Sequence, residues 1–178
     1  MKAITVRQPW VSLIASGDKK YETRSWPTKH RGPIAIHAGK QDDPDVFQFF
    51  LCKIATMEQL EACGITPKTL QKLPHGAVIA TAELVNVWRI VKEPGDDFLA
   101  SAIVNGTRRI TLRAESLSAD KHGLAEYFVP TEKEINLGYW HAGMYAWELQ
   151  NVKLLPEPIP AKGKQGLWDW EPEGGASK

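Results

Sequence analysis

The chain has 178 residues, of which 43% are hydrophobic and 24% are charged, and its formal net charge is +1. This length and composition indicate one ordered domain with a full hydrophobic core, and they exclude a disordered or fibrous protein. No apolar run approaches the roughly 20 residues that a membrane-spanning helix needs.

The sequence after Met1 passes directly into a strand-like pattern without the apolar core of a signal peptide. The two cysteines, Cys52 and Cys63, are too few for a disulfide framework and have no metal-ligand spacing. We therefore expect a cytoplasmic protein with buried, reduced thiols, no membrane partner, no metal and no cofactor.

The small net charge conceals a gradient along the chain. Residues 1–40 hold eight Lys or Arg and two acids, a balance of +6, so the remaining residues carry −5. Trp10, Trp26 and His37 lie in the same segment. A local excess of positive charge beside aromatic side chains is typical of a surface that binds an anion such as nucleic acid. The alternative is an ordinary solvated, lysine-rich surface.

The first predicted elements are a strand over residues 2–6 and a short helix that opens at residues 8–10, where proline suits the first helical position. Apolar side chains at helical spacing, among them Leu13 and Ile14, give this helix one apolar face. Gly17 follows the last turn and can adopt the left-handed conformation that ends a helix.

Residues 19–24 are expected to form a strand directly after this helix. Side chains alternate across a strand, so Glu22 and Arg24 share one face and Lys19 starts on the other. A turn or bulge beside Gly17 would bring Lys19 round to join them. Two cations and a carboxylate in one place suit an anionic or strongly polar ligand.

Helical and strand patterns then follow one another irregularly. Residues 42–63 have a helical pattern, and Thr66 followed by Pro67 predicts the N-cap and first residue of another helix. Residues 92–125 have no consistent pattern and are interpreted as an insertion. Strands are predicted at residues 33–38, 77–88 and 142–149, with 151–155 pairing nearby.

Residues 156–170 are rich in proline and should be extended, with their tryptophans packed on the body. The order of elements lacks the regular strand–helix alternation of a doubly wound sheet. It favours an α+β fold, a small mixed β-barrel with flanking helices and a helical insertion. We expect one domain over residues 1–170, with insertions at about 41–75 and 92–140, and a loose tail at 171–178.

Three motifs together resemble the ASCH domain family of the PUA-like superfamily. They are Arg7-Gln8-Pro9-Trp10, Gly17-x-Lys19-x-x-Glu22-x-Arg24 and Ile34-Ala35-Ile36-His37. Further likeness extends to the ASCH proteins related to the endothelial-overexpressed lipopolysaccharide-associated factor. It lies in Gly64-Ile65-Thr66-Pro67, in Gly76-Ala77-Val78-Ile79-Ala80 and in Glu157-Pro158-Ile159-Pro160-x-Lys162-Gly163.

The resemblance implies a PUA-like barrel with a cleft beside the first helix, lined by the motif that holds Lys19, Glu22 and Arg24. It also implies a role in RNA metabolism, since family members are reported or proposed to bind RNA, to cleave it or to hydrolyse N4-acetylcytidine. Some small amidohydrolase members carry threonine where this chain has Glu22, so their catalytic set does not transfer directly. The fold does not choose among these functions.

The candidate catalytic residues are Lys19, Glu22 and Arg24. Lys19 suits a phosphate contact, or a base or nucleophile if its pKa is lowered, and the alternative is a solvated lysine. Glu22 suits a general acid or base, or an acceptor for a nucleobase edge. Arg24 suits bidentate binding of phosphate or carbonyl oxygens. A Glu22–Arg24 pair that only holds the strand is the structural alternative.

The candidate ligand-binding residues lie around this motif. Trp26, in a polar turn, is a better candidate for base stacking than Trp10, which belongs to the apolar helix face. A histidine that ends an apolar strand, as His37 does, is more often a core residue than a catalyst. The predicted contacts to RNA or another ligand are Trp26, Lys29, Arg31, His37, Lys40, Lys162 and Lys164.

Three functions stay open on these residues. The first is recognition of RNA or a modified nucleoside in a basic cleft. The second is hydrolysis of N4-acetylcytidine or RNA in the same cleft without a metal ion. The third is a non-catalytic regulatory domain that binds a metabolite or peptide. We expect the first, with the second as an added activity; the sequence gives no oligomeric state.

Overall fold

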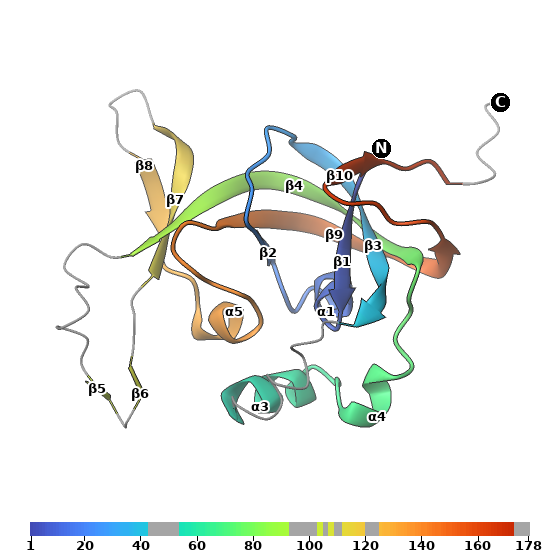
Figure 1. Ribbon diagram of the computed structural model, residues 1–178, viewed down its shortest axis with the longest axis horizontal. Helices are drawn as coiled ribbons and strands as arrows, with labels where there is room; N and C mark the ends of the chain where they lie inside the picture. Colours follow the sequence, from blue (N-terminus) through green and yellow to red (C-terminus); the bar gives the residue numbers. More distant parts are fainter. Residues whose placement is uncertain (43–53, 93–102, 105–106, 109–111, 120–124, 173–178) are drawn as a thin grey trace.

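A single curved sheet dominates the computed structural model, which describes residues 1–42, 54–92, 103–104, 107–108, 112–119 and 125–172 (Figure 1). The sheet comprises β1 (Lys2–Gln8), β2 (Tyr21–Arg24), β3 (Gly32–Asp42), β4 (Ala77–Lys92), β7 (Leu112–Ala119), β8 (Ala125–Phe128), β9 (Tyr145–Pro160) and β10 (Leu167–Asp169). A separate two-stranded pair is formed by β5 (Ile103–Val104) and β6 (Thr107–Arg108). The described helices are α1 (Trp10–Ser16), α3 (Ile54–Ala62), α4 (Pro67–Leu70) and α5 (Glu132–Asn136).

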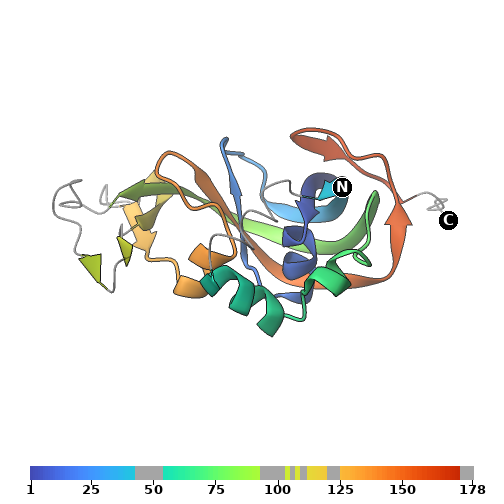
Figure 2. The same cartoon turned by 60° about the horizontal axis from the view of Figure 1, so that its bottom comes forward.

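The long strand β4 is the centre of the sheet. It pairs antiparallel with β3 and with β9, and β1 runs parallel to β3 while β2 runs antiparallel to β9. Three register shifts between β4 and β9 bend the pair, because bulges increase strand twist. The guanidinium of Arg24 on β2 donates to the carbonyl oxygen of Thr5 on β1 at 2.6 Å. Among the described residues β1 and β2 are not paired, but this side-chain hydrogen bond connects them, and the curved sheet forms a partly open barrel (Figure 2).

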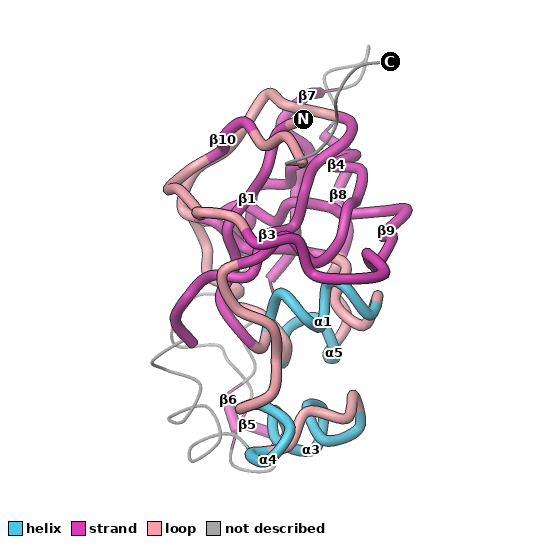
Figure 3. The backbone as a smooth tube through the Cα atoms, turned by 90° about the vertical axis from the view of Figure 1, so that its right-hand side faces the viewer, coloured by secondary structure: helices cyan, strands magenta, loops and turns pink. Residues whose placement is uncertain are grey.

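The main core fills this barrel. Strand residues such as Ile34, Ile36 and Trp147 pack there against Val11 and Ile14 of α1. A second cluster joins Leu13 of α1 to α3, α4 and the residue after α5. Figure 3 shows α1 and α5 next to the strands, with α3 and α4 farther out. The α+β class and the PUA-like barrel with flanking helices are thus confirmed.

Most predicted elements are present with shifted ends. Pro9 is the N-cap of α1 rather than its first residue, and Gly17 ends the helix with φ +83°. Thr66 caps α4 through a hydrogen bond from the Thr69 amide at 3.2 Å, as predicted. Of the predicted helix at 42–63, the structure describes residues 54–62 as α3, and the earlier part lies outside the described residues.

The stretch interpreted as an insertion in fact contributes to the main sheet. The end of β4 pairs with β7, and β7 pairs with β8. At the C-terminal end, β10 pairs with β1, and Trp168 and Trp170 are buried, as the prediction of a packed tail requires. Residues 173–178 and Cys52 lie outside the described residues; Cys63 is half-buried. Among the described helices, none has the length and apolar character to cross a membrane.

Candidate functional site

The end of α1 places Lys19 inside the protein. Gly17 turns the chain, and the amide of Lys19 donates to the carbonyl oxygen of Leu13 at 3.0 Å. The strand begins only at Tyr21, two residues later than predicted, so Lys19 does not follow the strand alternation. Its side chain is 1% exposed, and its ammonium donates to the carbonyl oxygen of Tyr21. The turn beside Gly17 therefore does bring Lys19 to the other motif residues.

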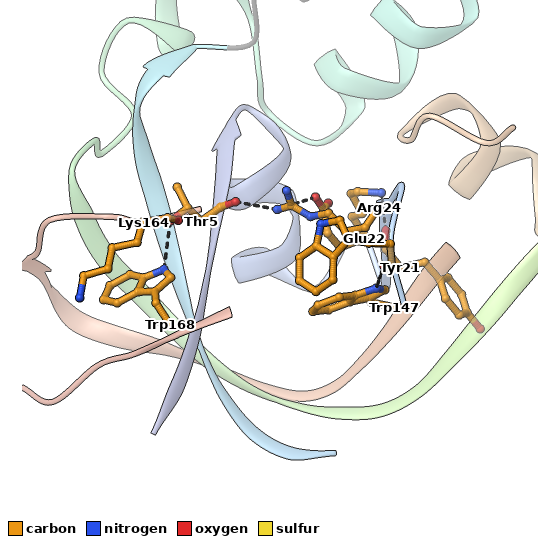
Figure 4. Close-up of polar contacts among 9 residues, drawn as sticks. Thr5, Tyr21, Glu22, Arg24, Trp147, Lys164 and Trp168 are labelled. Carbon is orange, nitrogen blue, oxygen red and sulfur yellow. Dashed lines mark hydrogen bonds and ion pairs between the residues drawn. The ribbon is translucent and has the colours of Figure 1, made fainter. Parts of the chain in front are cut away.

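Glu22 and Arg24 share the inward face of β2, as their spacing predicts. The Glu22 Oε1 atom and the Arg24 Nη2 atom are 3.2 Å apart. Arg24 lies between Glu22 and Thr5 in Figure 4, and Glu22 lies opposite the fully buried Trp147 of β9. The Glu22 side chain is 11% exposed, whereas the Arg24 side chain is 24% exposed. The motif cluster, defined as Lys19, Glu22 and Arg24, is thus reached from solvent through its arginine.

The pKa of Lys19 is lowered, and burial is the main cause. The carboxylates of Glu22 and Glu134 act in the opposite direction, and the Arg24 guanidinium adds to the lowering. Removal from water disfavours the charged ammonium more than the carboxylates favour it. A neutral amine at Lys19 is therefore more accessible than at a surface lysine, which is the condition for a base or nucleophile.

Part of the surroundings of Lys19 comes from residues 134–140, which lie in the stretch without a predicted structure. The Oε1 atom of Glu134 accepts a hydrogen bond from the Lys20 amide at 2.8 Å. The backbone carbonyl of Glu134 accepts one from the Trp140 indole at 2.7 Å. Gly138 lies against Lys19, because a Cβ there would be 3.0 Å from the ammonium nitrogen. One signal was available in the sequence: Thr131 and Glu134 have the spacing of a helix N-cap, and Thr131 does cap α5.

Glu134 is itself an unusual side chain for this position. It is 6% exposed, and its Oε2 atom is buried without a hydrogen-bond partner among the described residues. The segment from α5 to β9, residues 132–145, therefore covers the motif cluster from one side and brings a second carboxylate to it.

Trp26 follows the motif and is half-buried. Its ring meets that of Trp147 edge to face with centroids 4.7 Å apart, and its carbonyl accepts the Trp147 indole at 3.3 Å. Trp10 packs against both hydrophobic clusters, consistent with the predicted core role. Trp26 thus lies next to the motif cluster and is partly exposed, as a base-stacking residue must be.

The loop that follows β9 approaches the motif cluster from the other side. The Thr5 hydroxyl donates to the Lys164 carbonyl at 3.1 Å and accepts the Trp168 indole at 3.2 Å (Figure 4). Thr5 therefore contacts the loop through its side chain and Arg24 through its backbone.

His37 supports this loop from within. It is 1% exposed, and its Nε2 atom lies 3.1 Å from the Ala161 carbonyl. Gly163 lies directly on the imidazole, since a Cβ at Gly163 would be 2.4 Å from Cε1. Burial lowers the pKa of His37. The geometry is that of a buried residue that shapes the loop, which is the alternative stated for a histidine on an apolar strand.

Lys40 joins the same corner of the molecule. Its side chain runs along Gly76, whose carbonyl accepts the Ala161 amide at 2.9 Å. Lys40, Lys162 and Lys164 are all exposed. We call these three residues the lysine rim. The structure places two of the predicted phosphate contacts on the C-terminal loop and one on β3 beside it.

Lys29 and Arg31 lie at the opposite end of β3. Arg31 donates to the carbonyls of Thr28 and His30 at 3.0 and 2.8 Å and approaches Asn86 of β4 at 3.4 Å. These contacts hold the β2–β3 turn, and Lys29 is exposed within it. The predicted basic surface is therefore divided into two groups rather than forming one patch.

The described residues include no group of three His, Cys, Asp or Glu side chains arranged to hold a metal ion. A family model for the ASCH domain matches residues 4–153, which is most of the chain. The chain belongs to the ASCH domain family. ASCH domains are in general RNA-binding domains of the PUA-like type. The sequence-based resemblance to this family is thereby confirmed.

Two curated relatives of this ASCH chain share short segments with it. Activating signal cointegrator 1 of Mus musculus is 48% identical over 42 residues, which cover 23% of the chain and 7% of that protein. The Homo sapiens protein of the same name is 51% identical over 35 residues, covering 20% and 6%. The chain thus spans less than a tenth of the length of these relatives. The finer likeness to one ASCH subgroup stays a prediction.

Proposed function

We propose that this ASCH domain binds single-stranded RNA or a nucleoside derivative where the motif cluster adjoins the lysine rim. The observation that carries the proposal is the double contact of Thr5, whose carbonyl binds Arg24 and whose hydroxyl binds the Lys164 backbone. A partly exposed guanidinium and a cationic loop are thereby fixed relative to each other. A cytoplasmic location, where such RNA is available, is part of this proposal.

Each part of this surface suits one part of a nucleotide. The lysine rim supplies flexible cations for phosphates, whose contacts set affinity and its salt dependence. Arg24 offers planar N–H donors to a phosphate or carbonyl oxygen. Trp26 offers a ring face on which a base can stack, since every base has a π-face.

The test is a titration of short single-stranded RNA at several salt concentrations. Lys40→Ala, Lys162→Ala and Lys164→Ala are each expected to weaken binding and to reduce the slope of log affinity against log salt by about 0.7. Lys153→Ala removes an exposed lysine of β9 outside this surface and is the matched control. The Lys29→Ala variant tests the second basic group.

Absence of RNA binding by the wild type at low salt would contradict the proposal. That result would favour the regulatory alternative, in which the same surface takes a metabolite or a peptide.

We propose metal-independent hydrolysis as a second candidate function, on the evidence of Lys19. Its buried amine has a lowered pKa and lies beside two carboxylates and a guanidinium. A neutral Lys19 would take a proton from water as the water oxygen attacks an acyl carbon, and Arg24 would polarise the carbonyl oxygen. As the amide C–N bond of N4-acetylcytidine breaks, the Lys19 ammonium returns this proton to the departing N4 atom, which gives cytidine and acetic acid, and the acid ionises to acetate.

Because Lys19 is 1% exposed, this reaction requires the α5–β9 segment to move away from it. The measurement is acetate release from N4-acetylcytidine, and cleavage of an RNA panel, in the presence of a chelator. Activity that survives the chelator and is lost in a folded Lys19→Met variant supports hydrolysis. Failure of the wild type to turn over any of these substrates rejects it and leaves the binding proposal intact.

A further inference from the structure

We propose that Tyr139 and His141 form a second nucleobase-stacking site beside the motif cluster. The two rings lie on the turn between α5 and β9, with centroids 4.0 Å apart and planes inclined at 37°. Both residues are exposed, Tyr139 by 55%. The inference rests on the proposed function, because it adds a contact for a further base of the same single-stranded ligand.

The turn that carries these rings is held firmly. Trp140, between them in sequence, is 6% exposed and donates its indole N–H to the Glu134 carbonyl at 2.7 Å. Its ring also meets Tyr21 of β2 edge to face at 5.8 Å. With Trp140 fixed inward, its two neighbours are presented outward. Rings that are already ordered lose little conformational freedom when a base stacks on them.

The location ties the pair to the motif rather than to an unrelated surface. Gly138, the residue before Tyr139, lies against the ammonium of Lys19. Lys20 is exposed and bonded through its amide to Glu134 of α5, so a surface cation belongs to the same corner. Exposed aromatic rings and an exposed cation on neighbouring segments suit the base and the phosphate of a nucleotide.

Two stacking sites, the Tyr139–His141 pair and Trp26, then lie near the two ends of β2. The α5–β9 turn packs at Tyr21, the first residue of β2, and Trp26 follows Arg24 at its other end. The four residues of β2 span ~10 Å at the usual rise of a strand. This separation fits a ligand of several nucleotides better than a single nucleoside, and it therefore narrows the ligand class to an oligonucleotide.

The experiment compares RNA affinity of the full chain and its variants by fluorescence anisotropy with a labelled single-stranded oligonucleotide. Tyr139→Ala and His141→Ala are each expected to weaken binding by about 5- to 150-fold, the range that corresponds to one lost base stack. The salt slope should stay at the wild-type value, because a stack releases no counterions. Tyr139→Phe should bind like the wild type. Tyr127→Ala, at a 62% exposed tyrosine of β8, is the control.

The outcomes separate this inference from the proposed function. If Lys164→Ala weakens binding while Tyr139→Ala and His141→Ala match the Tyr127→Ala control, the stacking site is wrong and the proposed function stands. A reduced salt slope in Tyr139→Ala would also overturn the inference, since it would indicate a displaced phosphate contact. If the wild type binds no RNA, both proposals fail together. Thermal unfolding of each variant confirms that the fold is intact.

Discussion

The motif cluster and the lysine rim are both cationic, and they differ in almost everything else. Lys19 and Glu22 are buried, and each charged group of the motif cluster has charged or carbonyl neighbours. Lys40, Lys162 and Lys164 are exposed, and their ammonium groups are free to follow a ligand. Charges of the first kind are costly to remove singly, because a partner stays buried, whereas charges of the second kind act mainly on what binds.

The largest expected effect follows from removing the carboxylate of the motif cluster. Glu22→Ala leaves Arg24 and the buried Lys19 without their nearest anion, so we expect the free energy of unfolding to fall by about 3–5 kcal/mol. Urea denaturation measures it. Glu61→Ala, at an exposed glutamate of α3, is the control. A loss no larger than in this control would mean that the cluster contributes no more than surface charges do.

The next prediction tests whether packing against His37 holds the C-terminal loop, residues 161–166, in place. A methyl group at Gly163 would collide with the His37 ring, so Gly163→Ala should destabilise the fold by about 1–3 kcal/mol and displace Lys162 and Lys164. Gly39→Ala is the matched control, because a Cβ there would meet its neighbours at ordinary distances of 3.5 Å or more. Equal melting temperatures for the two variants would show that the loop yields easily.

The third effect is a pH dependence that belongs to Lys19. Because its folded pKa is below 10.5, the unfolded state binds more protons between the two values. Stability due to this group is therefore lowest below the folded pKa and rises with pH up to about 10.5, by at most about 1.4 kcal/mol per pH unit.

Unfolding by urea at pH 7, 8 and 9 measures this rise. Lys19→Met should lose it, whereas Lys20→Met, one residue away on the surface, should retain the wild-type profile. Parallel profiles for wild type and Lys19→Met would indicate that Lys19 stays charged in the folded protein over this range.

The smallest effect on the fold is expected at the lysine rim. Lys164→Ala should leave the melting temperature unchanged, because only the backbone of Lys164 is bonded to Thr5. RNA affinity should nevertheless fall, as described above. A clear loss of thermal stability would show that the rim, like the motif cluster, is part of the fold's own charge network.

The barrel could be predicted from the sequence because its signals are local. Gly17 marks the end of α1, Thr66 and Pro67 mark the start of α4, and the β-branched run of β4 marks the central strand. The proximity of Glu22 and Arg24 follows from strand alternation alone. The prolines and tryptophans of the tail likewise indicated an extended, packed segment.

The other half of the site depends on contacts between distant residues. Glu134 and Gly138 reach Lys19 from more than 110 positions away, and neither has a local pattern that indicates this. The division of the basic surface also escaped prediction, because the length of β3 separates Arg31, the residue before it, from Lys40 near its other end. A count of charges along a segment does not show where in the fold each charged side chain lies.

Thr5 gives the two regions a mechanical connection. A ligand that draws the C-terminal loop toward itself pulls on the Thr5 hydroxyl, and the same residue holds the arginine that fastens the first strand to the second. Ligand binding at the lysine rim should therefore slow amide hydrogen exchange along β1 and β2, the two strands that the Arg24–Thr5 hydrogen bond connects. The exchange rates of these two strands would then show whether a ligand is bound.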